Sequence, residues 1–123
     1  MSKGFLKIAE ELYELGKKSR GEKREFAFRS AISRAYYGVL WYIRDFYKLK
    51  GTDLHGMSRA ILEKKGLNEL KKELIWLGKA RNQADYEKNT SIDIDEGTTK
   101  YYIYLAKKII KGLKKWQQLL KTK

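Results

Sequence analysis

The chain contains no cysteine and no proline, and it has a single histidine among its 123 residues. Without cysteine it can form neither a disulfide nor a thiolate zinc site, and a cysteine nucleophile is excluded. One histidine, His55, is too few for a multi-histidine metal site or a metalloprotease helix. A serine-type triad would need this histidine, and no serine stands in the context of a nucleophile elbow. We therefore expect no metal site and no cofactor.

Long apolar runs and glycine-rich phosphate loops are missing as well. The longest apolar run, residues 35–43, lies between two arginines and falls short of the about 20 residues that span a membrane. The first eleven residues lack the apolar core of a signal peptide. No two glycines are separated by a single residue, so a dinucleotide-binding loop is not present. These features predict a cytoplasmic protein.

Positive charge is what the chain has in excess. It carries 28 Lys and Arg against 15 Asp and Glu, a formal net charge of +13, and residues 97–123 hold eight lysines and no acid. Such a field favours polyanions: RNA, DNA, nucleotides or an anionic membrane surface. A lysine-rich surface that serves only solvation, as in heat-adapted proteins, fits the composition equally well.

Apolar residues recur three and four positions apart almost throughout, and strand signals are weak. This periodicity predicts one all-α domain over residues 1–123, an up-and-down bundle of four main helices plus one short helix. The predicted helices cover residues 5–18, 23–49, 57–65, 68–87 and about 95–120. We expect Asn68 and Asp95 to cap the last two helices, and residues 88–93 to form a polar loop.

The long second helix is expected to be the most buried, because aliphatic and aromatic residues cover most of its circumference. The excess beyond one face indicates a subunit interface, and small residues should let a neighbouring helix approach closely: Ala27, Ala31, Ala35 and Gly38. On the first helix the predicted buried side is Phe5, Ile8, Leu12 and Leu15. On the last helix it is Tyr102, Leu105, Ile109, Leu113, Trp116 and Leu120, with lysines on the other face.

Arg81 stands where the fourth helix should carry an apolar residue. Leu70, Leu74 and Leu77 mark a buried row, and the next position on it is Arg81. Burying an unpaired guanidinium is costly, so the charge must be fully partnered or needed for a ligand. Asp85, four residues later on the same face, can orient the guanidinium or accept a proton.

A second set of polar residues lies in the apolar second helix. An arginine can donate two charge-assisted hydrogen bonds to a phosphate, and a tyrosine ring can stack on a base. Two such helices facing each other would make a small polar site, or a hydrogen-bonded network that only pins the helices together. The candidate nucleotide- or RNA-binding residues are Arg29, Ser33, Arg34, Tyr37, Arg81, Asn82, Asp85 and Tyr86.

Residues 29–38 and 80–86 together resemble the motifs of the HEPN domain proteins. These are small prokaryotic and archaeal helical-bundle proteins linked to nucleotide or RNA binding, and the resemblance covers nearly the whole chain. It implies a HEPN-like bundle that forms a homodimer. The family also pairs with minimal nucleotidyltransferases, which implies a partner protein of that kind and a place in a toxin–antitoxin or defence pair.

The same resemblance bears on catalysis. One branch of the family consists of metal-independent ribonucleases, whose motif is an arginine followed after four to six residues by a histidine. Arg81 matches that arginine, whereas the stretch after it offers Gln83, Asp85 and Tyr86. If the chain is an enzyme, the resemblance implies Arg81 and Asp85 as catalytic residues. His55 could supply an imidazole only if its loop folds back over the site.

Three hypotheses follow. The leading one is a nucleotide- or RNA-binding HEPN-type protein that acts with a minimal nucleotidyltransferase. The alternative is a metal-independent ribonuclease toxin that uses Arg81 and Asp85. The third is a structural bundle whose lysine-rich last helix binds nucleic acid without specificity.

Overall fold

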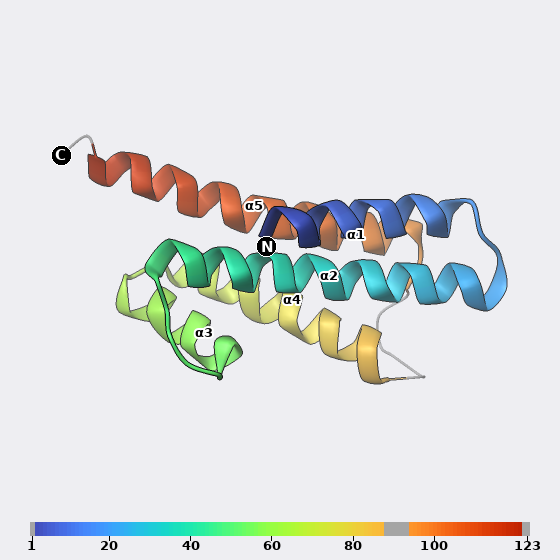
Figure 1. Ribbon diagram of the computed structural model, residues 1–123, viewed down its shortest axis with the longest axis horizontal. Coiled ribbons are helices and arrows are strands. Elements are labelled where there is room, and N and C mark those ends of the chain that lie inside the picture. The colour runs from blue at the N-terminus through green and yellow to red at the C-terminus, as the bar shows by residue number, and fades with distance from the viewer. Residues whose placement is uncertain (1, 88–93, 122–123) are drawn as a thin grey trace.

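The computed structural model describes residues 2–87 and 94–121, which form five α-helices and, within those two ranges, no strand (Figure 1). The helices are α1 (Ser2–Lys17), α2 (Gly21–Tyr47), α3 (Leu54–Lys64), α4 (Asn68–Tyr86) and α5 (Glu96–Lys121). The four long helices run alternately in opposite directions, and the short α3 lies beside α2 and α4 at one end (Figure 1). The predicted all-α bundle of four main helices and one short helix is confirmed.

The central helix is α2, as predicted. Its buried residues lie on several sides, because α1, α4 and α5 all pack against it: Ala27, Phe28, Ala31, Ile32, Ser33, Ala35, Tyr36, Gly38, Val39, Leu40 and Ile43. The small residues of α2 bring α1 close, since a Cβ atom added to Gly38 would lie 3.1 Å from the Leu6 side chain. The hydroxyl of Ser2 donates a 2.8 Å hydrogen bond to the Gly38 carbonyl, which fixes the register of the two helices.

The predicted buried side of α1 is wrong in part. Ile8 is 46% exposed and Leu15 is 41% exposed, while the buried residues of α1 are Ser2, Ala9 and Gly16. The reason is steric, because the ring of Phe28 on α2 fills the space beside Gly16 and leaves no room for a larger side chain. Small residues therefore form the contact and larger ones flank it.

The apolar row of α5 is buried as predicted as far as Leu113. Leu120 is 49% exposed, because the end of α5 extends past the other helices (Figure 1). Trp116 packs instead on Phe46 and Tyr47 at the end of α2, with ring centroids 6.3 and 6.2 Å apart. Some of the aromatic residues of α2 that were expected to face another subunit therefore pack against α5 of the same chain.

The two predicted caps had different outcomes. Asp95 caps α5, since its Oδ1 atom accepts a 2.7 Å hydrogen bond from the Thr98 amide. The prediction for Asn68 is wrong: α4 begins at that residue, Leu67 holds the cap position, and no side chain caps the helix. The predicted loop at 88–93 lies outside the described residues. None of the helices described is both long enough and apolar enough to cross a membrane.

Candidate functional site

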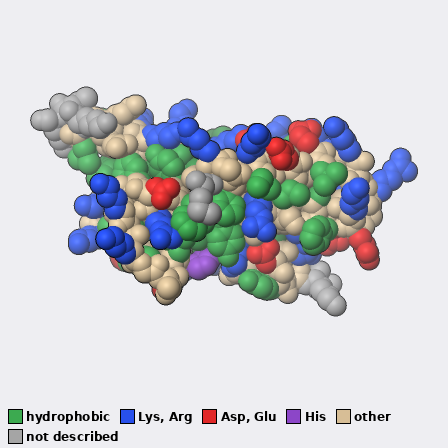
Figure 2. All heavy atoms as spheres, in the orientation of Figure 1, with side chains coloured by type: hydrophobic (Ala, Val, Ile, Leu, Met, Phe, Trp, Pro, Cys, Tyr) green, Lys and Arg blue, Asp and Glu red, His purple; other side chains and the backbone are tan. Residues whose placement is uncertain are grey.

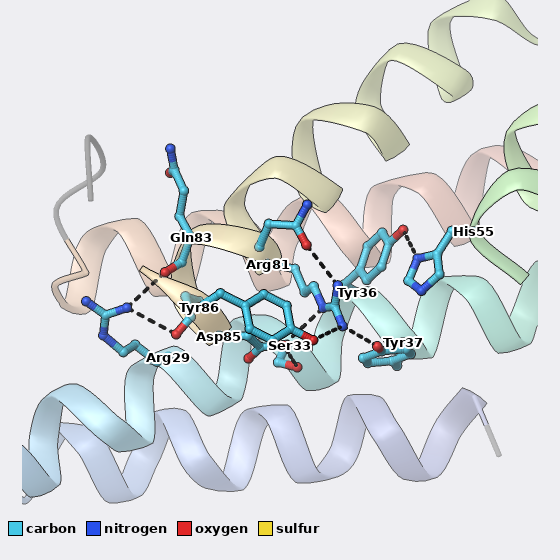
Figure 3. A network of polar contacts seen from close by, with 11 residues as sticks. Arg29, Ser33, Tyr36, Tyr37, His55, Arg81, Gln83, Asp85 and Tyr86 are labelled. Carbon is cyan, nitrogen blue, oxygen red and sulfur yellow. Dashed lines mark hydrogen bonds and ion pairs between the residues drawn. The ribbon is translucent and has the colours of Figure 1, made fainter. Parts of the chain in front are cut away.

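The polar residues of α2 and α4 meet around Arg81, whose side chain is 11% exposed (Figure 3). Its Nε atom lies 3.0 Å from Oδ2 of Asp85, one turn later on α4. The same carboxylate oxygen accepts a 3.0 Å hydrogen bond from the Ser33 hydroxyl on α2. Asp85 therefore orients the guanidinium, as the sequence predicted, and it also ties α4 to α2.

The remaining partners of Arg81 are neutral. Its NH1 atom donates to the Asn82 side-chain oxygen at 2.9 Å, and its NH2 atom donates to the hydroxyls of Tyr37 and, at 3.4 Å, Tyr86. The guanidinium carbon also lies 5.8, 5.0 and 5.3 Å from the ring centroids of Tyr36, Tyr37 and Tyr86. Contacts of this kind stabilise a cation away from bulk water. One carboxylate and three rings thus hold the buried charge.

Arg29, another predicted site residue, has its side chain at the end of α4. There, its NH1 atom donates to the carbonyls of Gln83 and Ala84 at 2.9 and 3.1 Å (Figure 3). It also donates to the Glu87 carbonyl at 2.8 Å. A cation there binds carbonyls of the last helical turn and complements the helix dipole. Arg29 therefore closes α4 instead of facing the Arg81 cluster.

Arg34 is exposed, and no hydrogen bond or ion pair joins it to the residues of the Arg81 cluster. Of the other predicted site residues, those brought together around the guanidinium are Ser33, Tyr37, Arg81, Asn82, Asp85 and Tyr86. The two sequence motifs, one on α2 and one on α4, therefore do face each other.

His55 reaches this cluster from α3. The loop after α2 turns back at Lys48 and Gly51, which have φ angles of 53° and 132°, and Asp53 caps α3 by accepting a 3.0 Å hydrogen bond from the Gly56 amide. As a result His55 Nδ1 lies 2.8 Å from the Tyr36 hydroxyl, and the two rings stack with centroids 5.5 Å apart. His55 thus belongs to α3, which begins earlier than the predicted residue 57, and the turn before α3 brings it back over the site, which was the condition for His55 to take part.

A cavity of about 370 Å³ opens between α3 and α4 beside His55. It is lined by Tyr36, His55, Arg59, Leu74, Ile75, Gly78, Lys79, Arg81 and Asn82. Three of these side chains are cations and none is a carboxylate. Arg59 and Lys79 were missed by sequence reasoning, although Arg59 stands four residues after His55 and so projects from the same side of a helix.

Burial and the nearby Arg81 lower the pKa of His55 below its ordinary 6.5, although Asp53 opposes the shift. Burial also raises the pKa of Tyr36 above 10.0. At neutral pH the imidazole is therefore neutral and the phenol keeps its proton. Figure 2 shows the histidine (purple) at the surface, at the edge of a hydrophobic patch (green) on a face where Lys and Arg side chains (blue) are scattered, so solvent can reach it.

The arrangement can hold an anion against three cations and can take up a proton at His55. Within residues 2–87 and 94–121, no three Asp, Glu or His side chains lie close enough together to hold a metal ion. Comparison of the chain with models of protein families, with curated proteins and with solved structures gave no match.

Proposed function

We propose that the protein binds a phosphate group of a nucleotide or of RNA in the cavity between α3 and α4. The observation that carries this proposal is the lining of that cavity, where Arg59, Lys79 and Arg81 converge without a carboxylate. Like charges brought together at a solvent-accessible hollow repel one another, and a bound dianion removes that repulsion. A phosphate also accepts hydrogen bonds from several donors at once.

The contacts of the cations fit this role. Within the described chain neither Arg59 nor Lys79 forms an ion pair, so both charges are available to a ligand. Arg81 is already oriented by Asp85 through Nε, while the one partner of its NH1 atom among residues 2–87 and 94–121 is the amide of the exposed Asn82. A phosphate oxygen would be a stronger acceptor for NH1 than that neutral amide.

The proposal includes the family and the partners that the sequence resemblance implies: a cytoplasmic HEPN-type homodimer that acts with a minimal nucleotidyltransferase in a toxin–antitoxin or defence pair. Its support is that both motifs, on α2 and α4, contribute to one cluster. Phe26, on α2 and 72% exposed, is a residue that a second copy of the chain could cover. Sedimentation at micromolar concentration tests this part, and a strictly monomeric protein would contradict it.

The binding experiment uses His55 as its reporter, because it is the only histidine. Inorganic phosphate and adenosine 5′-monophosphate are titrated separately while the ring signals of His55 are followed by NMR. We expect saturable shifts, and the double substitution R59Q/K79Q should weaken binding about tenfold or more. The matched control, R20Q/K23Q, removes two exposed charges from the start of α2 and should leave the affinity unchanged. Equal weakening by both variants would contradict a specific site.

A second candidate function, metal-independent RNA cleavage, is favoured by the place of His55. A neutral imidazole beside three cations could accept the proton of a ribose 2′-hydroxyl as that oxygen attacks the adjacent phosphorus. The cations would stabilise the charge that develops on the phosphate, and the imidazolium could return its proton to the leaving 5′-oxygen. This assigns the proton transfer to His55 and a positioning role to Asp85.

Incubation with RNA in the presence of EDTA tests the second function. Cleavage should yield 2′,3′-cyclic phosphate ends and should be lost in H55Q, which keeps a polar side chain on α3. Persistence of the same activity in H55Q would exclude this mechanism. Phosphate binding without cleavage in the wild type would leave the first proposal in place.

A further inference from the structure

A second surface of interest lies where α4 and α5 meet. Three large aromatic rings are exposed there: Trp76 by 51%, Tyr101 by 48% and Tyr104 by 59%. Together with Lys72 and Lys108 they line a hollow of about 430 Å³. Exposed rings that occur singly need no explanation, whereas a group of them marks a surface with a partner.

Lysines surround these rings. On α5, residues three or four apart share a face, and the exposed face that carries Tyr101 and Tyr104 also carries Lys100, Lys107, Lys108 and Lys111. The nearby carboxylates already have lysine partners: Glu73 pairs with Lys108 at 2.8 Å, Glu69 with Lys72 at 3.6 Å, and Glu10 with Lys107. These three pairs neutralise one another, and among the described residues Lys100 and Lys111 form no ion pair, so the surface keeps a net positive charge.

We propose that this aromatic–lysine strip, formed by Lys72, Trp76, Lys100, Tyr101, Tyr104 and Lys108, binds single-stranded RNA. The bases stack on the rings and the phosphates lie against the lysines. Stacking tolerates any base because every base has a π face, and only an unpaired strand presents those faces. The choice of RNA rests on the proposed function, whereas the strip itself is argued from its own residues.

Two features favour RNA over a protein partner. Lysine is depleted from the cores of protein interfaces, yet here it alternates with the rings. The rings also stand on rigid helices, with Tyr101 and Tyr104 about 4.5 Å apart along the axis of α5. The buried Tyr102 contacts Tyr101 edge-on, with centroids 5.2 Å apart, and so holds its ring in place.

The strip is joined to the cavity through α4. Lys79 lines the cavity and stands one turn after Trp76, which lines the hollow at the strip. An RNA strand whose bases stack on the strip can therefore direct its backbone across α4 toward Arg59 and Arg81.

The test measures the fluorescence anisotropy of a labelled adenine oligoribonucleotide of about 12 nucleotides. W76L should bind about tenfold more weakly than the wild type, while W76Y, which keeps an aromatic ring, should bind nearly as well. The control is I8A, which removes an exposed apolar side chain from α1, outside both the strip and the cavity, and should change nothing. A duplex RNA of equal length should bind more weakly at the same salt concentration.

The strip and the cavity can fail separately. If W76L loses RNA binding while the phosphate-induced shifts of the His55 signals stay as in the wild type, the strip is supported. Loss of RNA binding in W76L supports the strip even if R59Q/K79Q shows that the cavity binds no phosphate. Equal affinity of W76L and the wild type, or of duplex and single strand, would overturn the proposal. So would tighter binding of DNA of the same sequence, or a dimer that W76L converts to a monomer, since the occupant would then be DNA or a second copy.

Discussion

The charge of Arg81 is balanced by one carboxylate and surrounded by tyrosines, so the residue can both stabilise the bundle and serve a ligand. Asp85 and Ser33 fix its Nε side, while the NH1 side faces the neutral Asn82 next to the cavity. The two roles use different atoms of the same guanidinium. A structural role for Arg81 therefore does not exclude binding.

The structural role predicts strong coupling between Arg81 and Asp85. We expect R81M to lower the free energy of unfolding by about 2–3 kcal/mol, because it leaves a partly buried carboxylate without its cation. D85N should cost less in the R81M background than in the wild type, with a coupling energy of about 0.5–3 kcal/mol. Urea denaturation of the four proteins measures this. R34M, at an exposed position, should stay within about 0.5 kcal/mol of the wild type, and additive losses would contradict the ion pair.

The pKa of His55 makes stability depend on pH. Its pKa is lower in the folded state than the 6.5 of the unfolded chain, so between these values the unfolded state binds more protons. The His55 contribution to the free energy of unfolding is therefore present above pH 6.5 and is lost as the pH falls through the folded pKa. Urea denaturation between pH 7.5 and 5 should show this loss in the wild type, and H55Q should lack it. An identical pH profile for H55Q would contradict the assignment.

At the scale of the helices, the sequence predicted which segments are helical better than which faces are buried. Periodicity identified all five helices to within a few residues, but it assigned Ile8 and Leu15 to the core of α1. Hydrophobicity alone cannot show that a neighbour such as Phe28 excludes large side chains. Depth of burial depends on the distance between helices, which is a property of the pair.

Helix periodicity also explains which contacts of the candidate site could be predicted from the sequence. Arg81, Asp85 and Ser33 lie on two long helices, whose contacting faces follow from their periodicity. His55 and Arg59 lie on α3, whose position depends on the turn at Lys48 and Gly51. Lys48 has a left-handed backbone conformation, which residues with a Cβ atom rarely adopt and which the sequence therefore does not indicate. For this reason the approach of α3 to α4 could not be predicted.

The close contact of α1 with α2 gives a prediction for two glycines. An alanine Cβ at Gly16 would lie 2.4 Å from the fully buried Phe28 ring, whereas nothing lies within 4 Å of a Cβ at Gly4. G16A should therefore lower the free energy of unfolding by about 1–3 kcal/mol through overpacking. G4A, in the same helix, should be neutral or stabilising by up to about 1 kcal/mol. Thermal or urea denaturation checks the pair, and similar effects at both positions would contradict the packing described.

At the scale of the whole molecule, the net charge of +13 acts on folding and on binding in opposite directions. Lysines dominate α5 and its surroundings, so the folded chain concentrates like charges that the unfolded chain holds farther apart. Salt screens that repulsion within a Debye length of about 10 Å at 0.1 M. The same screening weakens contacts between lysines and phosphates.

We therefore expect the melting temperature to rise when NaCl is raised from about 20 to about 200 mM, while the affinity for an oligoribonucleotide falls. Differential scanning calorimetry and fluorescence anisotropy in the same buffers measure the two effects. K107Q/K111Q, which removes two of the α5 charges, should reduce both salt dependences. A melting temperature that falls with salt would show that the surface ion pairs outweigh the repulsion.

The cavity depends on how firmly α3 is held against the rest of the bundle. This helix fully buries only Ser58 and Leu62, and the Ser58 hydroxyl has no hydrogen-bond partner among the described residues. We therefore expect it to open locally at a lower cost than global unfolding, and the cavity needs α3 in place because His55 and Arg59 line it. A phosphate that bridges Arg59 to Lys79 and Arg81 would bind the closed form alone. Ligand occupancy would then be recorded as slower amide hydrogen exchange along α3, far beyond the atoms that touch the phosphate.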